Sequence, residues 1–178
     1  MLFVLTAIPA GCIFSPHKDD GKVIIVPPDY PKLENPFSVL DALELAYAAK
    51  DSNEIKLLYD DQNYQGTSFD PVNQNQIPLT WSDEVRHVAR LAQTPAITGI
   101  KLTFPPAKVR ETDLLDPPGW AMIKIQNMTL ELTDNSTNTF FHLVSSDNFE
   151  YHFIPHTPDA SSTTDTTWKI VRWTEFQN

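Results

Sequence analysis

Residues 38–59 read Ser38-Val-Leu-Asp-Ala-Leu-Glu-Leu-Ala-Tyr-Ala-Ala-Lys-Asp-Ser-Asn-Glu-Ile-Lys-Leu-Leu-Tyr59, and residues 168–173 read Trp168-Lys-Ile-Val-Arg-Trp173. The first segment predicts a largely apolar helix, a short polar break at residues 50–53 and a second helix. The second segment predicts a strand that closes a sheet, and most of the sequence between the two is strand-like. This order indicates a curved sheet folded around a long helix, with a pocket inside the curve.

Asn35 and Pro36 mark the start of the first helix. An asparagine accepts hydrogen bonds from the free N–H groups of a first turn. Proline costs no hydrogen bond at the first helical position, because the N–H group that it lacks would have no partner there. From Phe37 to Ala49 the polar residues are few. We therefore expect a helix whose wide apolar surface is wrapped by the rest of the fold.

Between this region and residue 95 the sequence predicts a strand at 64–69, a polar loop at 71–78 and a third helix that opens at Trp81. Ser82 is the expected cap of this helix, and Asp83 and Glu84 are acids of its first turn. Its expected buried stripe consists of Val85, Val88, Ala89 and Ala92.

Beyond residue 95 the apolar residues repeat with the period of a strand, as at Ile100, Leu102 and Phe104. Further strands are predicted at 140–154, with an interruption near 145–148, and at 168–176.

The segment 120–133 changes its apolar phase from odd positions, ending at Ile125, to even positions, beginning at Met128. A change of phase inside one strand predicts a β-bulge, here near Gln126-Asn127. Because bulges bend a sheet, this one supports the expected curvature.

The composition narrows the classes of function. A length of 178 residues fits one domain with a tail. The net charge is −10, from 13 Lys and Arg against 23 Asp and Glu, and no basic stripe is present. Such a surface repels phosphate backbones, so nucleic-acid binding is disfavoured.

Cys12, the single cysteine, follows an apolar run that ends in Ala10-Gly11. Small residues before a lone cysteine resemble a bacterial lipoprotein signal, in which the thiol is lipidated. The alternative is an apolar N-terminus with an incidental cysteine. On the lipoprotein reading, residues 1–12 are the signal segment, 13–33 a Pro- and Asp-rich tether, and 34–178 a single α+β domain.

That reading predicts a domain anchored by its lipid to the bacterial cell envelope, facing the periplasm or the exterior. Ile13 stands where an aspartate would favour retention in the inner membrane, so the outer membrane is preferred.

The order of elements resembles that of the nuclear transport factor 2-like superfamily over about residues 34–176. The resemblance rests on Leu45-Ala-Tyr47, Leu57-Leu-Tyr59, the helix after a Trp and the closing Trp168-Lys-Ile-Val-Arg-Trp173. The superfamily includes ketosteroid isomerases, scytalone dehydratases and SnoaL-like cyclases, and this chain looks most like its uncharacterised bacterial lipoproteins. The resemblance implies an α+β cone, a strongly curved antiparallel sheet wrapped around N-terminal helices. It also implies a possible homodimer through the convex face of the sheet.

Five aromatic residues are candidates for lining the mouth of the cone and binding a small apolar ligand. The alternative is that they are simply core. The resemblance gives Tyr47 the further role of a hydrogen-bond donor in an isomerase-type site, but no carboxylate base is matched by a motif. The candidates are Tyr47, Tyr64, Trp81, Phe104 and Trp120.

His142, His152 and Glu150 share strand parity, which is one arrangement that binds zinc. The apolar residues of opposite parity fit the buried face better, so we expect the histidines to face outward or towards a dimer partner. Asp113 and Asp116 are interpreted as turn residues. No metal and no cofactor are predicted.

Three hypotheses of function follow. The first is a non-catalytic envelope domain that binds a small apolar ligand or a partner protein. The second is a lyase or isomerase that acts inside the cone, and the third is a structural dimerisation domain. The sequence leans away from an enzyme, because no catalytic set is matched.

Overall fold

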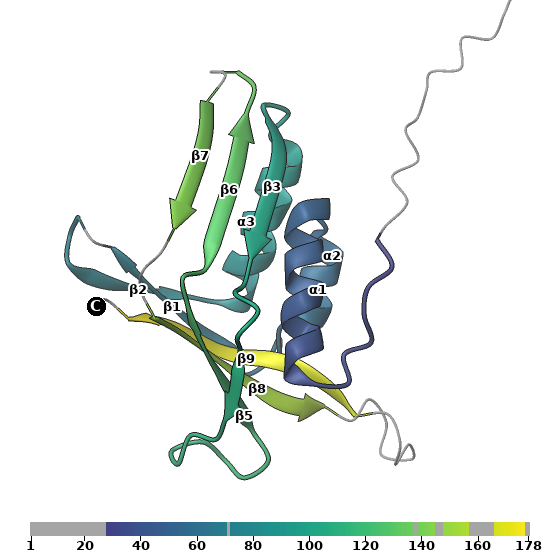
Figure 1. The fold of residues 1–178 in the computed structure, drawn as a ribbon, viewed down its shortest axis with the longest axis vertical. Coiled ribbons are helices and arrows are strands. Elements are labelled where there is room, and N and C mark those ends of the chain that lie inside the picture. The colour runs from purple at the N-terminus through teal and green to yellow at the C-terminus, as the bar shows by residue number, and fades with distance from the viewer. Residues whose placement is uncertain (1–27, 71, 137–138, 145–147, 157–165, 177–178) are drawn as a thin grey trace, which may run out of the picture.

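The computed structural model describes residues 28–176 except 71, 137–138, 145–147 and 157–165, with the backbone alone at 139–144 and 148 (Figure 1). The proposed signal segment, Cys12 and most of the tether lie outside these residues and stay predictions. Among the residues described, no helix has the length and apolar character needed to cross a membrane.

The first two helices form where the sequence places them. Helix α1 spans Pro36–Ala49 and α2 spans Ser52–Leu58. The side chain of Asn35 accepts hydrogen bonds from the N–H groups of Phe37 and Ser38, each at 3.0 Å, so the predicted cap is confirmed. The C-cap of α1 is Lys50, whose backbone is left-handed with φ 55°.

Replacing Asn35 by Ala should lower the free energy of unfolding by about 1 kcal/mol, because two N–H groups of the first turn of α1 lose their acceptor. Urea denaturation would measure the change. Asn35→Asp keeps the acceptor and should cost much less; an equal loss in both variants would contradict the capping role.

The third helix, α3, spans Trp81–Gln93, and its cap differs from the prediction. Thr80, not Ser82, is the N-cap, and it exchanges hydrogen bonds with Asp83. With the helix beginning at this position, the side chains of Glu84 and Val88 are buried in the protein interior, while Ala92 is exposed. The expected apolar stripe is therefore wrong in part, because it omitted the glutamate.

Nine strands form two sheets among the described residues. The six-stranded sheet has the order β2-β1-β9-β8-β5-β4, and the three-stranded sheet has the order β3-β6-β7. All pairs of these strands are antiparallel except β1 with β9, which are parallel. The bounds are β1 Gln65–Asp70, β2 Asn75–Leu79, β3 Ile97–Thr103, β4 Val109–Glu111, β5 Ala121–Gln126, β6 Thr129–Asp134, β7 Thr139–Val144, β8 Asn148–His156 and β9 Thr167–Phe176.

Strand β2 corrects the prediction of a polar loop at 71–78. It pairs with β1 at the edge of the sheet, and nearly all its side chains are exposed. An exposed edge strand buries neither face, so it lacks the apolar alternation by which strands are recognised.

The phase change at Gln126-Asn127 marks the passage from one sheet to the other. Strand β5 ends at Gln126, Asn127 is left-handed with φ 59°, and β6 begins at Thr129 in the second sheet. The sequence located the bend correctly, but the structure breaks the strand there rather than inserting a bulge. The two sheets stand at a steep angle as a result (Figure 1).

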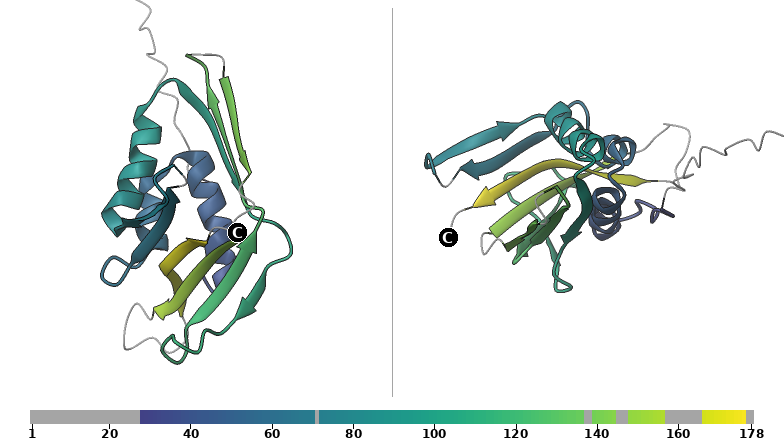
Figure 2. Two further views of the ribbon diagram at one scale, coloured as in Figure 1. Left: turned by 90° about the vertical axis from the view of Figure 1, so that its left-hand side faces the viewer. Right: turned by 90° about the horizontal axis from the view of Figure 1, so that it is seen from above.

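The core lies between the concave face of the sheets and the helices, which gather on one side (Figure 2). Helix α1 packs against both β3 and β9, and so joins the two sheets. Leu40 and Leu43 of α1 and Ile123 and Phe153 of the sheet are at most 1% exposed. The α+β, strongly curved architecture predicted from the sequence is confirmed, with one parallel pair in the sheet.

Candidate functional site

A buried glutamate lies inside the cone. Glu84, in the first turn of α3, is 7% exposed. Its Oε1 accepts a hydrogen bond from the Tyr64 hydroxyl at 2.6 Å and another from the Trp173 indole N–H at 2.8 Å. Burying a carboxylate is costly unless donors compensate it, so these contacts hold Glu84 in one position.

Local structure fixes the two donors. Tyr64 follows a turn in which the N–H groups of Gln62 and Asn63 bind the carboxylate of Asp60. The Asp60 N–H in turn binds the carbonyl of Ile170 at 2.8 Å, which ties the turn to β9. Trp173 lies further along β9, opposite Gly66 of β1.

Gly66 leaves the space that the donors use. A Cβ at this position would lie 2.5 Å from the Tyr64 hydroxyl and 3.1 Å from Trp173 Nε1. Real Cβ atoms essentially never show the first distance, the second is unusually tight, and both groups are already held by Glu84. The glycine is therefore part of the site.

Replacing Gly66 by Ala should lower the free energy of unfolding by about 2 kcal/mol, because the new methyl group displaces a hydrogen-bonded tyrosine. Guanidinium denaturation would measure it. Gly99→Ala is the matched control: its Cβ would meet Thr133 Oγ1 at 3.3 Å. We expect that variant to be near neutral, and equal losses would contradict the role of Gly66.

Three more tyrosines surround Glu84, and the name interior cluster denotes Glu84, Tyr47, Tyr59, Tyr64, Tyr151 and Trp173. Burial raises the pKa of Tyr47, Tyr59, Tyr64 and Tyr151, and the nearby Glu84 carboxylate raises each further. The rings of Tyr59 and Tyr64 meet edge-on at 4.8 Å, and those of Tyr151 and Trp173 stack at 6.2 Å. The cluster is an aromatic shell around one carboxylate.

The second oxygen of Glu84 is uncommitted. Both hydrogen bonds go to Oε1, and no donor of the described residues binds Oε2. Tyr47, Trp81 and Trp173 keep partial exposure in a region where most neighbours are fully buried. The interior thus presents an acceptor with apolar rings around it.

Four of the five candidate aromatic residues pack into the same core. Tyr64 and Phe104 belong to it, Tyr47 and Trp81 pack against it, and Phe104 meets Tyr151 edge-on at 5.7 Å. Trp81 Nε1 is buried without a hydrogen-bond partner among the described residues. Trp120 lies outside this core and shares a pocket with Arg172.

Sequence reasoning missed Glu84, Tyr59, Tyr151 and Trp173 as members of a site. Glu84 was interpreted only as a first-turn acid of α3. A signal was present, because Glu84 and Val88 are one helical turn apart and share a face.

A second polar cluster lies on the convex face, and the name convex triad denotes Asp116, His152 and Arg172. Arg172 Nη2 donates to Asp116 Oδ1 at 2.6 Å, and His152 Nδ1 lies 2.5 Å from Asp116 Oδ2. The side chains of His152 and Asp116 are 3% and 4% exposed. Asp113 lies 3.9 Å from Arg172.

The structure confirms Asp113 and Asp116 as turn residues, because the Asp116 N–H binds the Asp113 carbonyl at 3.2 Å. It adds a role that the sequence did not indicate, since Asp116 is also the buried partner of Arg172. His152 does face away from the apolar residues, but the residue is 2% exposed rather than open to solvent. Its expected companion His142 has its side chain outside the described residues.

The ligand atoms of Asp113, Asp116 and His152 lie within 4.8 Å of one another, close enough for a metal ion. Arg172 Nη2 lies 2.6 Å from Asp116 and 2.8 Å from His152 Nδ1. The guanidinium therefore already supplies the positive charge that a metal would bring, and we assign no metal here.

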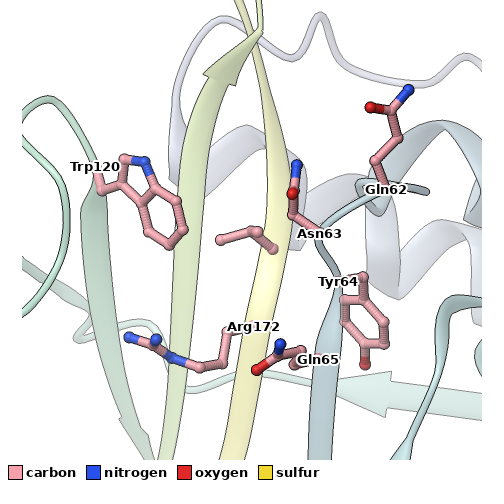
Figure 3. Close-up of a pocket in the computed structure, with 7 residues that line it drawn as sticks. Gln62, Asn63, Tyr64, Gln65, Trp120 and Arg172 are labelled. Carbon is pink, nitrogen blue, oxygen red and sulfur yellow. The ribbon is translucent and has the colours of Figure 1, made fainter.

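Beside the triad is a pocket of about 350 Å³, here called the convex-face pocket. Figure 3 shows Trp120 on one side and Asn63 and Gln65 on the other, with the Arg172 guanidinium on the Trp120 side. Its lining residues are Gln62, Asn63, Tyr64, Gln65, Trp120, Val171 and Arg172.

Solved structures share this architecture. A nuclear transport factor 2-like superfamily protein from Salmonella enterica serovar Typhimurium aligns over 78% of this chain and 84% of its own, with a TM-score of 0.55 and 9% identity. A protein of this fold from Rhodospirillum rubrum, described as of unknown function in nutrient uptake, aligns over 79% and 96%, with a TM-score of 0.54 and 11% identity.

A hexachlorocyclohexane dehydrochlorinase, LinA-type3, from Novosphingobium barchaimii aligns over 79% of this chain and 82% of its own, with a TM-score of 0.52 and 6% identity. No protein-family model matches the chain, and no curated protein matches it.

The three structural alignments show that this protein has the nuclear transport factor 2-like fold. It is an α+β cone with a buried carboxylate inside.

Proposed function

We propose that the cone binds a small, mainly apolar molecule that carries one O–H or N–H group. The observation that supports this proposal is the uncommitted Oε2 of Glu84 among the aromatic rings of the interior cluster. A buried carboxylate gains most from a donor at each oxygen, and Oε1 already has two. A guest whose polar group donates to Oε2 completes the set while its apolar part contacts the rings.

The neutral probe N-phenyl-1-naphthylamine tests this proposal, because it is apolar and has one N–H. We expect saturable fluorescence enhancement with the native protein. Glu84→Gln should weaken binding about tenfold or more, because a hydrogen bond to a charged group is lost. In that variant the amide oxygen can still accept from Tyr64 and Trp173, but the guest meets an NH₂ group.

Two controls make the result specific. Glu34→Gln changes an exposed carboxylate that lies outside the interior cluster and has Lys32 as its ion-pair partner, and it should leave binding unchanged. The N-methylated probe, which has no N–H, should bind native protein and Glu84→Gln alike. Absence of saturable binding, or equal effects of Glu84→Gln and Glu34→Gln, would refute the site.

The second candidate function is a lyase or isomerase. The same free oxygen of Glu84 can accept a proton from a bound carbon acid, while Tyr47 or Tyr151 donates to the oxygen that gains charge. Exchange of α-hydrogens of a cyclic ketone in D₂O, followed by mass spectrometry, tests it. Exchange by the native protein but not by Glu84→Gln would support catalysis. If the native protein shows no exchange, the catalytic proposal is refuted and only the ligand-binding proposal remains.

We also propose that Cys12 carries a lipid and that the domain faces outward from a bacterial envelope, by preference at the outer membrane. The small residues before Cys12 and the Pro-rich stretch after it support this placement. Expression in a bacterial host with membrane fractionation tests it. The native chain should sediment with membranes and Cys12→Ser should not; identical fractionation would count against the anchor.

A further inference from the structure

The convex-face pocket shares Tyr64 with the interior cluster, but its other lining residues belong to none of that cluster and give it a different chemistry. Its residues come from three separate segments: the turn that leads into β1 together with the first residue of β1, the end of the loop before β5, and β9. Its walls carry carboxamides, an indole and a guanidinium beside Tyr64 and Val171 (Figure 3). Its volume of about 350 Å³ is at the small end of the range of ligand sites.

The guanidinium of Arg172 is already fixed in position by Asp116 before any ligand binds. Asp116, whose side chain is 4% exposed, binds Arg172 Nη2 at 2.6 Å. The other oxygen of Asp116 meets His152, so both carboxylate oxygens have partners. Arg172 keeps 35% exposure of its side chain, and the other nitrogens of its guanidinium have no partner among the described residues. A fixed donor group loses little freedom when it binds a ligand.

The opposite wall offers groups that both donate and accept. Asn63, which lines the pocket, uses its amide nitrogen to bind Asp60 at 3.1 Å, so its amide oxygen has no partner in that contact. The side-chain amides of Gln62 and Gln65 form no hydrogen bond within the described structure. Carboxamides match hydroxyl groups, because each kind of group donates and accepts at once.

The charges around the pocket disfavour an ionic ligand. Arg172 is balanced by Asp116, and Asp113 lies 3.9 Å from the same guanidinium. A carboxylate ligand would approach two carboxylates, and an ammonium ligand would approach the guanidinium. Trp120 adds an aromatic surface that suits the C–H face of a ring.

We infer that the convex-face pocket binds a neutral carbohydrate, one pyranose ring of which packs on Trp120 while its hydroxyl groups contact Gln65, Asn63 and Arg172. A neutral pyranose has hydroxyl groups that donate and accept, a C–H face and no charge. This inference does not rest on the function proposed for the cone, although Tyr64 belongs to both sites.

Isothermal titration and saturation-transfer NMR with methyl β-glucopyranoside and methyl N-acetyl-β-glucosaminide test the inference. We expect saturable binding of at least one of the two at millimolar concentration. Trp120→Ala should weaken it about fivefold or more through loss of ring packing. Gln65→Ala should weaken it as well, whereas Gln76→Ala, an exposed glutamine on β2, should not. Circular dichroism would show that the variants fold.

Several results would overturn the inference. The first would be that neither glycoside binds saturably, or that glucuronate or glucosamine binds more tightly than both. The second would be that Glu84→Gln abolishes binding while Trp120→Ala keeps it, which would place the sugar inside the cone. The third would be a dimer in sedimentation that Trp120→Ala dissociates, which would make the pocket an interface between two copies.

Discussion

Alkaline solution should unfold this protein steeply, with a fall of about 4 kcal/mol in the free energy of unfolding between pH 10 and pH 11. Burial, with a contribution from Glu84, raises the pKa of Tyr47, Tyr59, Tyr64 and Tyr151 above the ordinary value of 10.0. In the unfolded chain these hydroxyls ionise near pH 10, while in the folded chain they stay neutral. The stability they contribute is therefore fully present below pH 10 and is lost as the pH rises towards their folded pKa values.

The magnitude follows from counting these tyrosines. Each contributes about 1 kcal/mol over that interval, because its unfolded form releases a proton that its folded form keeps. A typical domain has about 5–15 kcal/mol of stability in total, so unfolding should follow within one or two pH units.

Guanidinium denaturation at a series of alkaline pH values measures this fall directly. The near-ultraviolet absorbance of tyrosinate should rise together with the loss of circular dichroism, in one transition. Tyr47→Phe and Tyr64→Phe should each reduce the fall by about 1 kcal/mol. Titration of the tyrosines near pH 10 in a protein that stays folded would show that water reaches the cone freely.

Arg172→Met should lower the free energy of unfolding by about 3 kcal/mol, because it leaves Asp116 buried without its cation. The Asp116 side chain is 4% exposed. Once Arg172 is removed, His152 is the only member of the convex triad that still contacts it. Methionine keeps much of the aliphatic packing of arginine, so the loss reports the charge.

A matched pair of variants tests that interpretation by denaturant unfolding. Lys124→Met removes a cation that is 50% exposed and bridges Glu111 and Glu150, and should cost less than about 1 kcal/mol. Asp116→Asn combined with Arg172→Met should recover part of the loss, because no buried charge is stranded. Equal losses from Arg172→Met and Lys124→Met would contradict the burial argument.

Local patterns predicted the parts of the fold that obey local rules. The start of α1 was predictable because Asn35 and Pro36 act on the turn that follows them. The bend at Asn127 was predictable because a change of apolar phase is visible within one segment. Strand β2 was not, since its pairing with β1 leaves an exposed edge without apolar alternation.

The candidate sites needed tertiary information. Glu84 meets Tyr64 and Trp173 only because the α3 start, the turn before β1 and β9 converge. Arg172 is part of Trp168-Lys-Ile-Val-Arg-Trp173, which was interpreted correctly as a closing strand. Nothing in that pattern indicates that Asp116, from a Pro-rich loop, binds it.

The parallel pairing of β1 with β9 has a consequence for how the chain folds as it is made. Strand β9 lies between β1 and β8 in the sheet, although β1 is synthesised long before it. Among the described strands, the β1–β2 hairpin pairs only with β9, so it joins the sheet only after Thr167–Phe176 has left the ribosome. Contacts of such long sequence separation slow folding, so the β1–β2 hairpin should stay undocked until β9 has been synthesised.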